Sequence, residues 1–164
     1  MLLGILSDSH GDVRRLTMAV LEMGRVNVLL HAGDFFEDSR RLQEAVDVKV
    51  FGVMGNCDHI ATGPMEKVIE VGGNTILLTH GHQYGVKRDK KALTRRAITL
   101  GVNAVVFGHT HVAETFSSGG ILFVNPGSCR FSRCDRGPSY ATLDILPDGS
   151  LMPAIHVLAR GVTP

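Results

Sequence analysis

The sequence predicts an α/β protein, a single domain over residues 1–164 with a mixed or doubled β-sheet. Two observations predict this class. Short runs of Val, Ile and Leu alternate with helical patterns in the first half of the chain, whereas the last third consists of short strand-like runs separated by glycine-containing turns. A chain of 164 residues with a hydrophobic fraction of 44% is large enough to bury one continuous core.

The first half alternates between strands and helices. The apolar run Leu2–Leu6 predicts a buried strand. A helix is expected over Val13–Met23, where apolar residues recur at helical spacing and Gly24 marks the end. The elements expected next are a strand at Val26–Leu30, a short helix around Ser39–Val46 and a strand at Val48–Val53. Continuous apolar strands joined by helices indicate parallel pairing with helices on the faces of the sheet.

The middle of the chain begins with a hairpin. Lys67–Val71 and Asn74–Leu78 flank the pair Gly72-Gly73, which permits a tight two-residue turn. The elements expected after the hairpin are a helix over Asp89–Leu100 and strands at Ala104–Phe107, Val112–Phe116, Ile121–Val124, Tyr140–Ile145 and Leu151–Leu158. The second half is therefore richer in strands than the first.

Composition and charge limit the class of function. The 17 basic and 16 acidic residues give a net charge of +1, which provides no long-range attraction to nucleic acid or to an anionic membrane. No uncharged stretch is long enough for a signal peptide or a membrane span. The cysteines are odd in number and form no C-x-x-C pair, which favours free thiols in a reducing cytoplasm. They are Cys57, Cys129 and Cys134.

A basic cluster in the middle of the chain suggests a nucleic-acid interpretation. It lies on the helix predicted over residues 89–100, whose other face is apolar, so a solvated helix face is the favoured interpretation. The cluster consists of Lys87, Arg88, Lys90, Lys91, Arg95 and Arg96. We therefore expect neither nucleic acid nor membrane as a partner, and the sequence leaves a homo-oligomer open.

Five short polar motifs each follow an apolar strand-like run. They are Asp8-Ser9-His10, Gly33-Asp34, Gly55-Asn56-Cys57-Asp58, Thr79-His80-Gly81-His82 and Gly108-His109-Thr110-His111. Ligands gather at the carboxyl edge of open α/β sheets, because loops after neighbouring strands converge there. Imidazole, carboxylate and amide groups together suit divalent cations of intermediate hardness. The motifs therefore predict one cleft that holds two metal ions and cleaves phosphate esters.

The spacing within two motifs sharpens this prediction. Residues two apart in an extended chain face the same side and lie about 6–7 Å apart. Asp8 and His10 can therefore converge on one ion. His109 and His111 can reach one ion, or two neighbouring ions about 3.5–4 Å apart.

One family carries such residues in the same order. The sequence resembles the calcineurin-like metallophosphoesterases in Asp8-x-His10, Gly33-Asp34, Gly55-Asn56, His80 and Gly108-His109-x-His111. The forms GNCD, THGH, GHTH and NPGS (Asn125–Ser128) are similar to those of its small bacterial and archaeal phosphodiesterase branch, which is related to the eukaryotic retromer subunit of the same fold. The resemblance implies two stacked mixed β-sheets flanked by helices, a four-layer α/β/β/α sandwich.

The resemblance also implies a set of metal ligands. The first ion would be held by Asp8, His10, Asp34 and His111. The second ion, bridged to the first by Asp34, would be held by Asn56, His80 and His109. Manganese is the expected metal, with nickel, iron, cobalt, zinc and magnesium as alternatives, because mixed nitrogen and oxygen ligands admit all of them.

The expected reaction is hydrolysis of a small phosphodiester. Two divalent ions against two carboxylates leave two positive charges, and a bridging hydroxide reduces them to one. That remainder matches the single negative charge of a diester. The metals would lower the pKa of the bridging water, and the hydroxide would attack phosphorus in line with the leaving oxygen.

The predicted catalytic residues are Asn56, Asp58 and His109. Many relatives carry a histidine after the Gly-Asn pair, which implies a general acid for the leaving alkoxide, but here that position is Cys57. A thiol forms poor hydrogen bonds, so good leaving groups such as phenolates are expected to be favoured. Asp58 or His59 could supply a proton instead.

Alternatives are open at this point. One is a non-catalytic metal-binding scaffold for protein assembly, although every ligand position is filled by a competent residue. Another is a phosphomonoesterase or a cyclic-nucleotide phosphodiesterase, which the missing histidine disfavours. Taken singly, Asp8, Asp34 and Asp58 are typical helix N-caps and Asn56 is a typical turn former.

Other polar residues carry weaker expectations. His82 is either a residue that orients a ligand or braces the substrate, or a plain loop histidine. His31 is expected in the core or beside a ligand, and His156 has no expected role. A group of arginines follows NPGS, and one of them could contact a phosphate. These are Arg130, Arg133 and Arg136.

Overall fold

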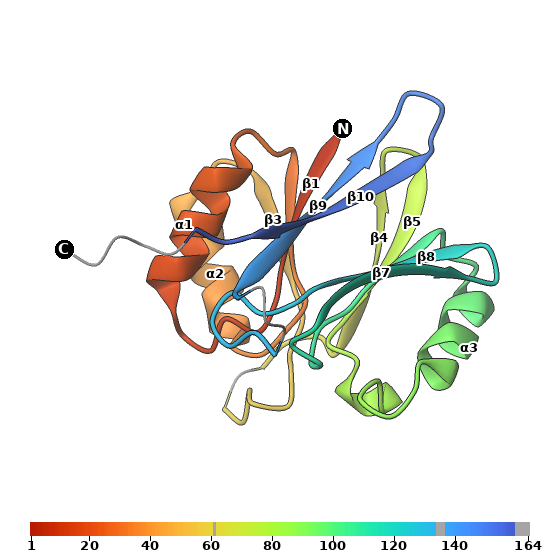
Figure 1. The fold of residues 1–164 in the computed structure, drawn as a ribbon, viewed down its shortest axis with the longest axis horizontal. Coiled ribbons are helices and arrows are strands. Elements are labelled where there is room, and N and C mark those ends of the chain that lie inside the picture. The colour runs from red at the N-terminus through yellow and green to blue at the C-terminus, as the bar shows by residue number, and fades with distance from the viewer. Residues whose placement is uncertain (61, 134–136, 160–164) are drawn as a thin grey trace.

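The computed structural model describes residues 1–60, 62–133 and 137–159. Two five-stranded mixed sheets pack face to face, with α1 and α2 on the outer face of one and α3 on the outer face of the other (Figure 1). The predicted four-layer α/β/β/α sandwich is confirmed. Within the described ranges, no helix is long and apolar enough to cross a membrane.

The first sheet has the strand order β10-β9-β1-β2-β3. Its strands are β1 (Leu2–Leu6), β2 (Val28–His31), β3 (Lys49–Gly52), β9 (Ser139–Ile145) and β10 (Leu151–Val157). β1, β2 and β3 pair in parallel, β9 is antiparallel to β1, and β10 is antiparallel to β9. Parallel pairing needs crossover connections. Helices α1 (Val13–Met23) and α2 (Phe36–Ala45) provide them.

The second sheet has the strand order β4-β5-β6-β8-β7. Its strands are β4 (Glu66–Val71), β5 (Asn74–Thr79), β6 (Ala104–Val106), β7 (Ala113–Ser118) and β8 (Ile121–Pro126). β5, β6 and β8 are parallel, and β4 and β7 are antiparallel at the two edges. The short helix η1 (His82–Tyr84) and helix α3 (Lys91–Leu100) connect β5 to β6.

Side chains along β1 alternate between two cores, because successive residues of a strand point to opposite faces. Leu3 and Ile5 belong to the core between the sheets, together with Ile76 of the second sheet. Leu6 belongs to the core under the helices, where it clusters with Leu16 of α1. A third cluster packs α3 against the far face of the second sheet. These three cores hold the strand ends of both sheets at fixed positions.

Most element boundaries follow the sequence pattern, and the start of α2 is the main difference. The pattern predicts that helix around Ser39–Val46, but it begins at Phe36. Its first backbone N–H, that of Phe36, donates to Asp58 Oδ1 at 2.7 Å. A cap supplied by a side chain 22 residues away leaves no local signal in the sequence.

Candidate metal centre

The five motifs meet at one edge of the molecule. They follow β1, β2, β3, β5 and β6, whose C-terminal ends gather on the lower side of the view in Figure 1. The first three strands belong to one sheet and the last two to the other. Residues 101 positions apart, Asp8 and His109, are joined by a hydrogen bond there. The convergence expected from the strand ends is therefore observed.

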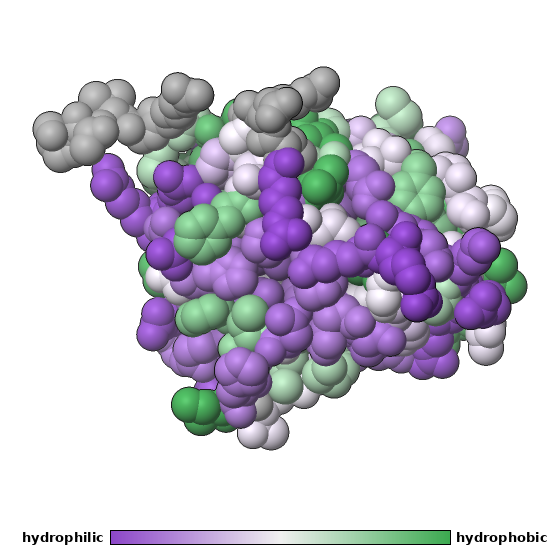
Figure 2. Space-filling model, turned by 60° about the horizontal axis from the view of Figure 1, so that its bottom comes forward, coloured by the Kyte–Doolittle hydropathy of each residue, from purple (hydrophilic) through white to green (hydrophobic). Residues whose placement is uncertain are grey.

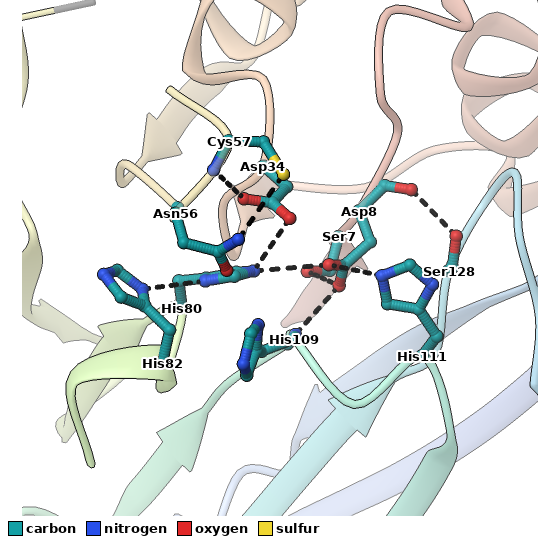
Figure 3. Close-up of polar contacts among 12 residues, drawn as sticks. Ser7, Asp8, Asp34, Asn56, Cys57, His80, His82, His109, His111 and Ser128 are labelled. Atoms are coloured by element: carbon teal, nitrogen blue, oxygen red, sulfur yellow. Dashed lines mark hydrogen bonds and ion pairs between the residues drawn. The ribbon is translucent and has the colours of Figure 1, made fainter. Parts of the chain in front are cut away.

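Asp8 is fully buried, and its two carboxylate oxygens have different partners (Figure 3). Oδ2 accepts hydrogen bonds from the Ser7 hydroxyl at 2.6 Å and from the His109 backbone N–H at 3.0 Å. Oδ1 lies 3.1 Å from His111 Nε2 and 3.2 Å from His80 Nε2. The fold thus anchors one oxygen and presents the other to imidazoles.

Asp34 repeats this arrangement. It is 2% exposed, and its Oδ1 accepts a hydrogen bond from the Cys57 backbone N–H at 2.9 Å. Its Oδ2 lies 3.5 Å from His80 Nε2 and 3.9 Å from His10 Nε2. The unanchored oxygens of both carboxylates therefore face the same group of histidines.

Two of these histidines are oriented through their second ring nitrogen. His111 Nδ1 lies 2.8 Å from the Phe131 carbonyl oxygen, so it donates to that oxygen and leaves Nε2 for the site. His80 Nδ1 lies 2.9 Å from His82 Nδ1. Such contacts fix the ring and choose the nitrogen that a metal meets. His82, whose role the sequence leaves open, lies where it orients His80.

Burial favours the neutral form of several imidazoles, which is the form that binds metal. It lowers the pKa of His10 and of His82, and it lowers the pKa of His109 to about 4. His111 differs, because its hydrogen bond to Asp8 raises its pKa. At Asp8, burial acts to raise the pKa, but hydrogen bonds from imidazoles outweigh it and hold the pKa well below its usual range.

The first predicted ligand set forms a compact group. One ligand atom from each of its four members lies within 4.8 Å of the other three. The members are Asp8, His10, Asp34 and His111. In the part of the chain that the structure describes, neither buried carboxylate is paired with a lysine or an arginine. Two buried carboxylates with no cationic side chain beside them other than imidazoles fit a bound cation, because unpaired buried charges are strongly destabilising.

The second predicted set lies on the other side of Asp34. His80 contacts Asp34 as described, and the rings of His80 and His109 have centroids 4.8 Å apart. Asn56 is exposed, and in Figure 3 its amide oxygen points toward His80. This arrangement fits a second ion that shares Asp34 with the first.

Most of the backbone strain in the described residues is found at this site. A positive φ in a residue other than glycine costs roughly 1–2 kcal/mol. Such residues cluster at functional sites. In the described ranges they are Asp8, His10, Asp34, Phe35, His109 and His111. Five of these six are predicted ligands, so the strain coincides with the groups that aim into the site.

Two motif glycines make room for carboxylates from other loops. A Cβ at Gly108 would lie 2.0 Å from Ser7 Oγ and 2.7 Å from Asp8 Oδ2. A Cβ at Gly55 would lie 2.0 Å from Asp34 Oδ1. No side chain fits at these distances, so glycine permits the loops after β6 and β3 to approach Asp8 and Asp34.

The expected proton donors have different surroundings. Asp58 accepts the Phe36 N–H at Oδ1 and the Gly55 N–H at Oδ2, both at 2.7 Å. This matches the capping alternative, since both oxygens support backbone. Burial, together with a hydrogen bond to Asp34 and its charge, raises the pKa of the Cys57 thiol to about 11. His59 is exposed.

Sequence reasoning missed three residues that support the site. Ser7 anchors Asp8, and Phe131 orients His111 through its backbone oxygen. Ser128 donates to the Asp8 carbonyl oxygen at 2.8 Å and accepts the Phe131 N–H at 2.8 Å. The NPGS motif contains Ser128 and was a usable signal, whereas nothing local marks the other two.

The remaining polar residues have varied positions. Arg130 Nη1 donates to the His10 carbonyl oxygen at 2.6 Å, so this arginine lies beside the site. The Arg133 backbone N–H donates to the His111 carbonyl oxygen at 3.1 Å. Arg136 and Cys134 lie outside the described residues. His31 is buried and lies 2.9 Å from Ser9 Oγ, beneath the first motif. His156 contacts Thr142 at 2.8 Å on β9, away from the motifs.

Comparisons with known proteins agree with this geometry. The family described as the calcineurin-like phosphoesterase superfamily domain matches residues 1–148. The probable metallophosphoesterase YsnB of Bacillus subtilis is 36% identical over 149 residues, which cover 89% of this chain and 85% of that protein.

Two solved structures share the fold. A predicted phosphoesterase from Streptococcus pneumoniae has a TM-score of 0.82 and 29% identity, over 98% of this chain and 94% of that one. Wild-type Vps29 from Entamoeba histolytica, solved in complex with Zn²⁺, has a TM-score of 0.73 and 27% identity, over 97% of this chain and 100% of that one.

Proposed function

Because the chain belongs to the calcineurin-like phosphoesterase superfamily, a family of hydrolases, we propose that it is a phosphodiesterase that uses two divalent metal ions. One observation carries the proposal. Four ligand atoms from three loops lie within 4.8 Å of one another, and the carboxylate of Asp34 also faces a further histidine, His80. The sets lie side by side, as a dinuclear site requires.

The residues of the chain supply position and charge. When bound, two divalent ions activate water and stabilise negative charge on phosphate oxygens. Asp34 presents Oδ2 to both ligand sets while the Cys57 N–H holds Oδ1. Asp8 is held by Ser7 and by the His109 N–H, so neither carboxylate can rotate freely. Side chains fixed in this way would hold bound ions with little movement of the ligands.

The surroundings of Asn56 support a diester with a good leaving group. The neighbouring Cys57 thiol is a weak hydrogen-bond donor, and both Asp58 oxygens already accept backbone N–H groups. An aryl oxygen leaves without prior protonation, whereas an alkoxide needs an acid. Small aryl phosphodiesters are therefore the proposed substrates, ahead of phosphomonoesters and cyclic nucleotides.

We propose manganese as the metal, because carboxylate, imidazole and amide donors together suit it. Nickel, iron, cobalt, zinc and magnesium are the alternatives. The free thiols of Cys57 and Cys129 agree with the proposed cytoplasmic location.

The test is turnover of bis(4-nitrophenyl) phosphate by protein loaded with manganese. His80→Ala and His109→Ala should each reduce turnover by roughly 100-fold or more. His156→Ala is the matched control, since it removes a histidine on β10 that lies away from the motifs, and it should retain wild-type turnover. Wild-type rates in both site variants would overturn the assignment.

A second candidate is a metal-binding scaffold for protein assembly, which the likeness to Vps29 supports. Measurement of metal content together with turnover separates the two functions. Two bound ions per chain with no turnover across aryl and alkyl diesters would favour the scaffold.

A further inference from the structure

Two phenylalanine side chains are exposed beside the metal centre. The chain has seven phenylalanines, all in the described ranges, and only Phe35 (38%) and Phe131 (52%) are exposed. Both contact the same histidine. The ring centroids of Phe35 and His10 lie 5.7 Å apart, and those of Phe131 and His10 also lie 5.7 Å apart. The two exposed aromatic rings are therefore neighbours of one metal ligand.

The backbone of Phe35 is strained. Its φ is 74°, in the left-handed region that bulky residues rarely adopt. Among the six described non-glycine residues with positive φ, it is the one that is not a predicted ligand. Its ring also packs over Gly11, where an added Cβ would meet Phe35 Cε1 at 3.5 Å. The ring is thus held in place at the rim of the site, at a position where glycine would relieve the strain.

Phe131 is tied to the first ligand set through its backbone. Its N–H donates to Ser128 Oγ at 2.8 Å, and its carbonyl oxygen accepts from His111 Nδ1 at 2.8 Å. The guanidinium of Arg130 lies 4.5 Å from the centroid of the Phe131 ring, and its Nη1 donates to the His10 carbonyl oxygen. The backbone of Phe131 is therefore fixed beside the site, and its ring has a cation near it.

The face that contains the strand ends is otherwise polar. Figure 2 brings the lower side of Figure 1 forward, and hydrophilic side chains dominate it, with separate hydrophobic ones among them. Exposed aromatic rings that pack against a predicted metal ligand on such a face suit a planar apolar partner. Aromatic rings attract one another in stacked or edge-on geometry beyond the effect of buried area.

We infer that Phe35 and Phe131 bind a planar aromatic ring on the part of the phosphodiester that is not released. This inference rests on the proposed function and adds a substrate class to it. The recognised group is a phenyl ring or a nucleobase, which share a flat π-face. An aliphatic ester group would contact the same rings over a smaller area and without ring–ring attraction.

The test compares substrates that share 4-nitrophenolate as leaving group, so that leaving-group effects cancel. The retained groups are ethyl, phenyl and 5′-thymidine. For the wild type, KM should be roughly 3- to 10-fold lower for at least one aromatic ester than for the ethyl ester, with similar kcat. A preference for thymidine over phenyl identifies a nucleobase, and the reverse identifies a simple aryl group.

Variants then assign the effect to the two rings. Phe35→Leu and Phe131→Leu should raise KM for the preferred aromatic ester roughly 3- to 10-fold, raise KM for the ethyl ester by a smaller factor, and leave the metal content unchanged. Leu21→Ala removes an apolar side chain that is 74% exposed on α1 and serves as the control. Equal KM values for all three esters in the wild type, or equal losses on all three in the variants, would overturn the inference.

A binding measurement keeps the inference separate from turnover. Phenyl methylphosphonate and ethyl methylphosphonate are stable monoanions whose affinities for the manganese-loaded protein can be measured by calorimetry. A phenyl preference of about 3-fold or more that Phe35→Leu removes would support the inference, and equal affinities would refute it. If none of the three esters is hydrolysed, the proposed phosphodiesterase activity fails, while the ratio of affinities still decides the role of the rings.

Discussion

At the scale of single residues, Asp58 shows how one carboxylate can serve either chemistry or structure. Both of its oxygens accept backbone N–H groups, from Phe36 at the start of α2 and from Gly55 before Asn56. Asp58→Ala leaves both donors without a partner, which should lower the free energy of unfolding by about 1–3 kcal/mol. Urea denaturation measures this change.

The matched control for this change is Asp47→Ala, at an exposed position, which should stay within about 0.5 kcal/mol of the wild type. Unchanged stability in Asp58→Ala, together with a loss of rate on alkyl diesters only, would instead establish Asp58 as the proton donor.

Phe35 provides a second test, of backbone strain. At a φ of 74°, alanine carries the left-handed penalty and glycine does not. Phe35→Gly should therefore be more stable than Phe35→Ala by roughly 0.5–1 kcal/mol, after allowance for the greater freedom of glycine in the unfolded chain. Thermal unfolding of the two variants gives the difference, and a more stable alanine variant would show that the backbone relaxes out of this region.

The convergence of the proposed ligands could be predicted from the sequence, because each lies in a short motif directly after an apolar run. Ser7, Phe35 and Phe131 could not. Ser7 donates to Asp8 Oδ2, which also accepts the N–H of the distant His109, and the importance of Phe35 depends on a dihedral angle. The structure brings the first ligand set together, whereas the roles of Asn56 and Asp58 in catalysis stay predictions.

At the scale of elements, the loop after β6 depends on close approach. Gly108→Ala places a Cβ within 2.0 Å of Ser7 Oγ, so the loop that carries His109 and His111 must move. A shift of about 1 Å in catalytic groups can reduce rates roughly 100-fold. We expect loss of bound metal and a loss of activity of that order, with the far-ultraviolet circular dichroism spectrum retained.

Gly73→Ala is the control for this loop, because its Cβ would meet nothing within 4 Å. It strains the β4–β5 hairpin, whose φ at that residue is 75°, and should retain the metal. Equal metal loss in both variants would show that general destabilisation, and not the contact with Ser7, is responsible.

The elements themselves were largely predictable. β1 and α1 have the predicted boundaries, because apolar periodicity and Gly24 define them locally. α2 begins three residues earlier than the pattern indicates, because Asp58 supplies its first partner from a distant loop. The short helix η1 carries no apolar period and was missed.

At the scale of the whole molecule, metal should stabilise the fold. Asp8 and Asp34 are buried, and in the described residues neither is paired with a lysine or an arginine, so without a cation only imidazoles and neutral hydrogen-bond donors oppose their charges. A ligand present at 100 times its Kd adds about 2.7 kcal/mol. For a chain of this size that corresponds to a rise in Tm of roughly 5–10 °C.

The measurement is differential scanning calorimetry of protein stripped with a chelator, before and after manganese is restored. The double variant Asp8→Asn with Asp34→Asn serves as the control, because it lacks both negative charges and should show no metal-dependent shift. An unchanged Tm in the wild type would contradict the assignment of these carboxylates as ligands.

The mixed strand directions followed from the sequence, but the separation into two facing sheets came from the resemblance to a family. Local patterns show that a strand is buried, and they do not show which sheet it joins. β8, for example, lies between β6 and β7 through contacts that no local signal reveals.

The proposed ligands come from both halves of the sandwich. Asp8, His10 and Asp34 follow strands of the first sheet, whereas His80 and His111 follow strands of the second. An ion coordinated by residues from both sheets would link the two sheets directly. Hydrogen exchange at β1 and β6 should therefore slow together when the ion is bound, because the set of proposed ligands is complete only when both sheets are in place.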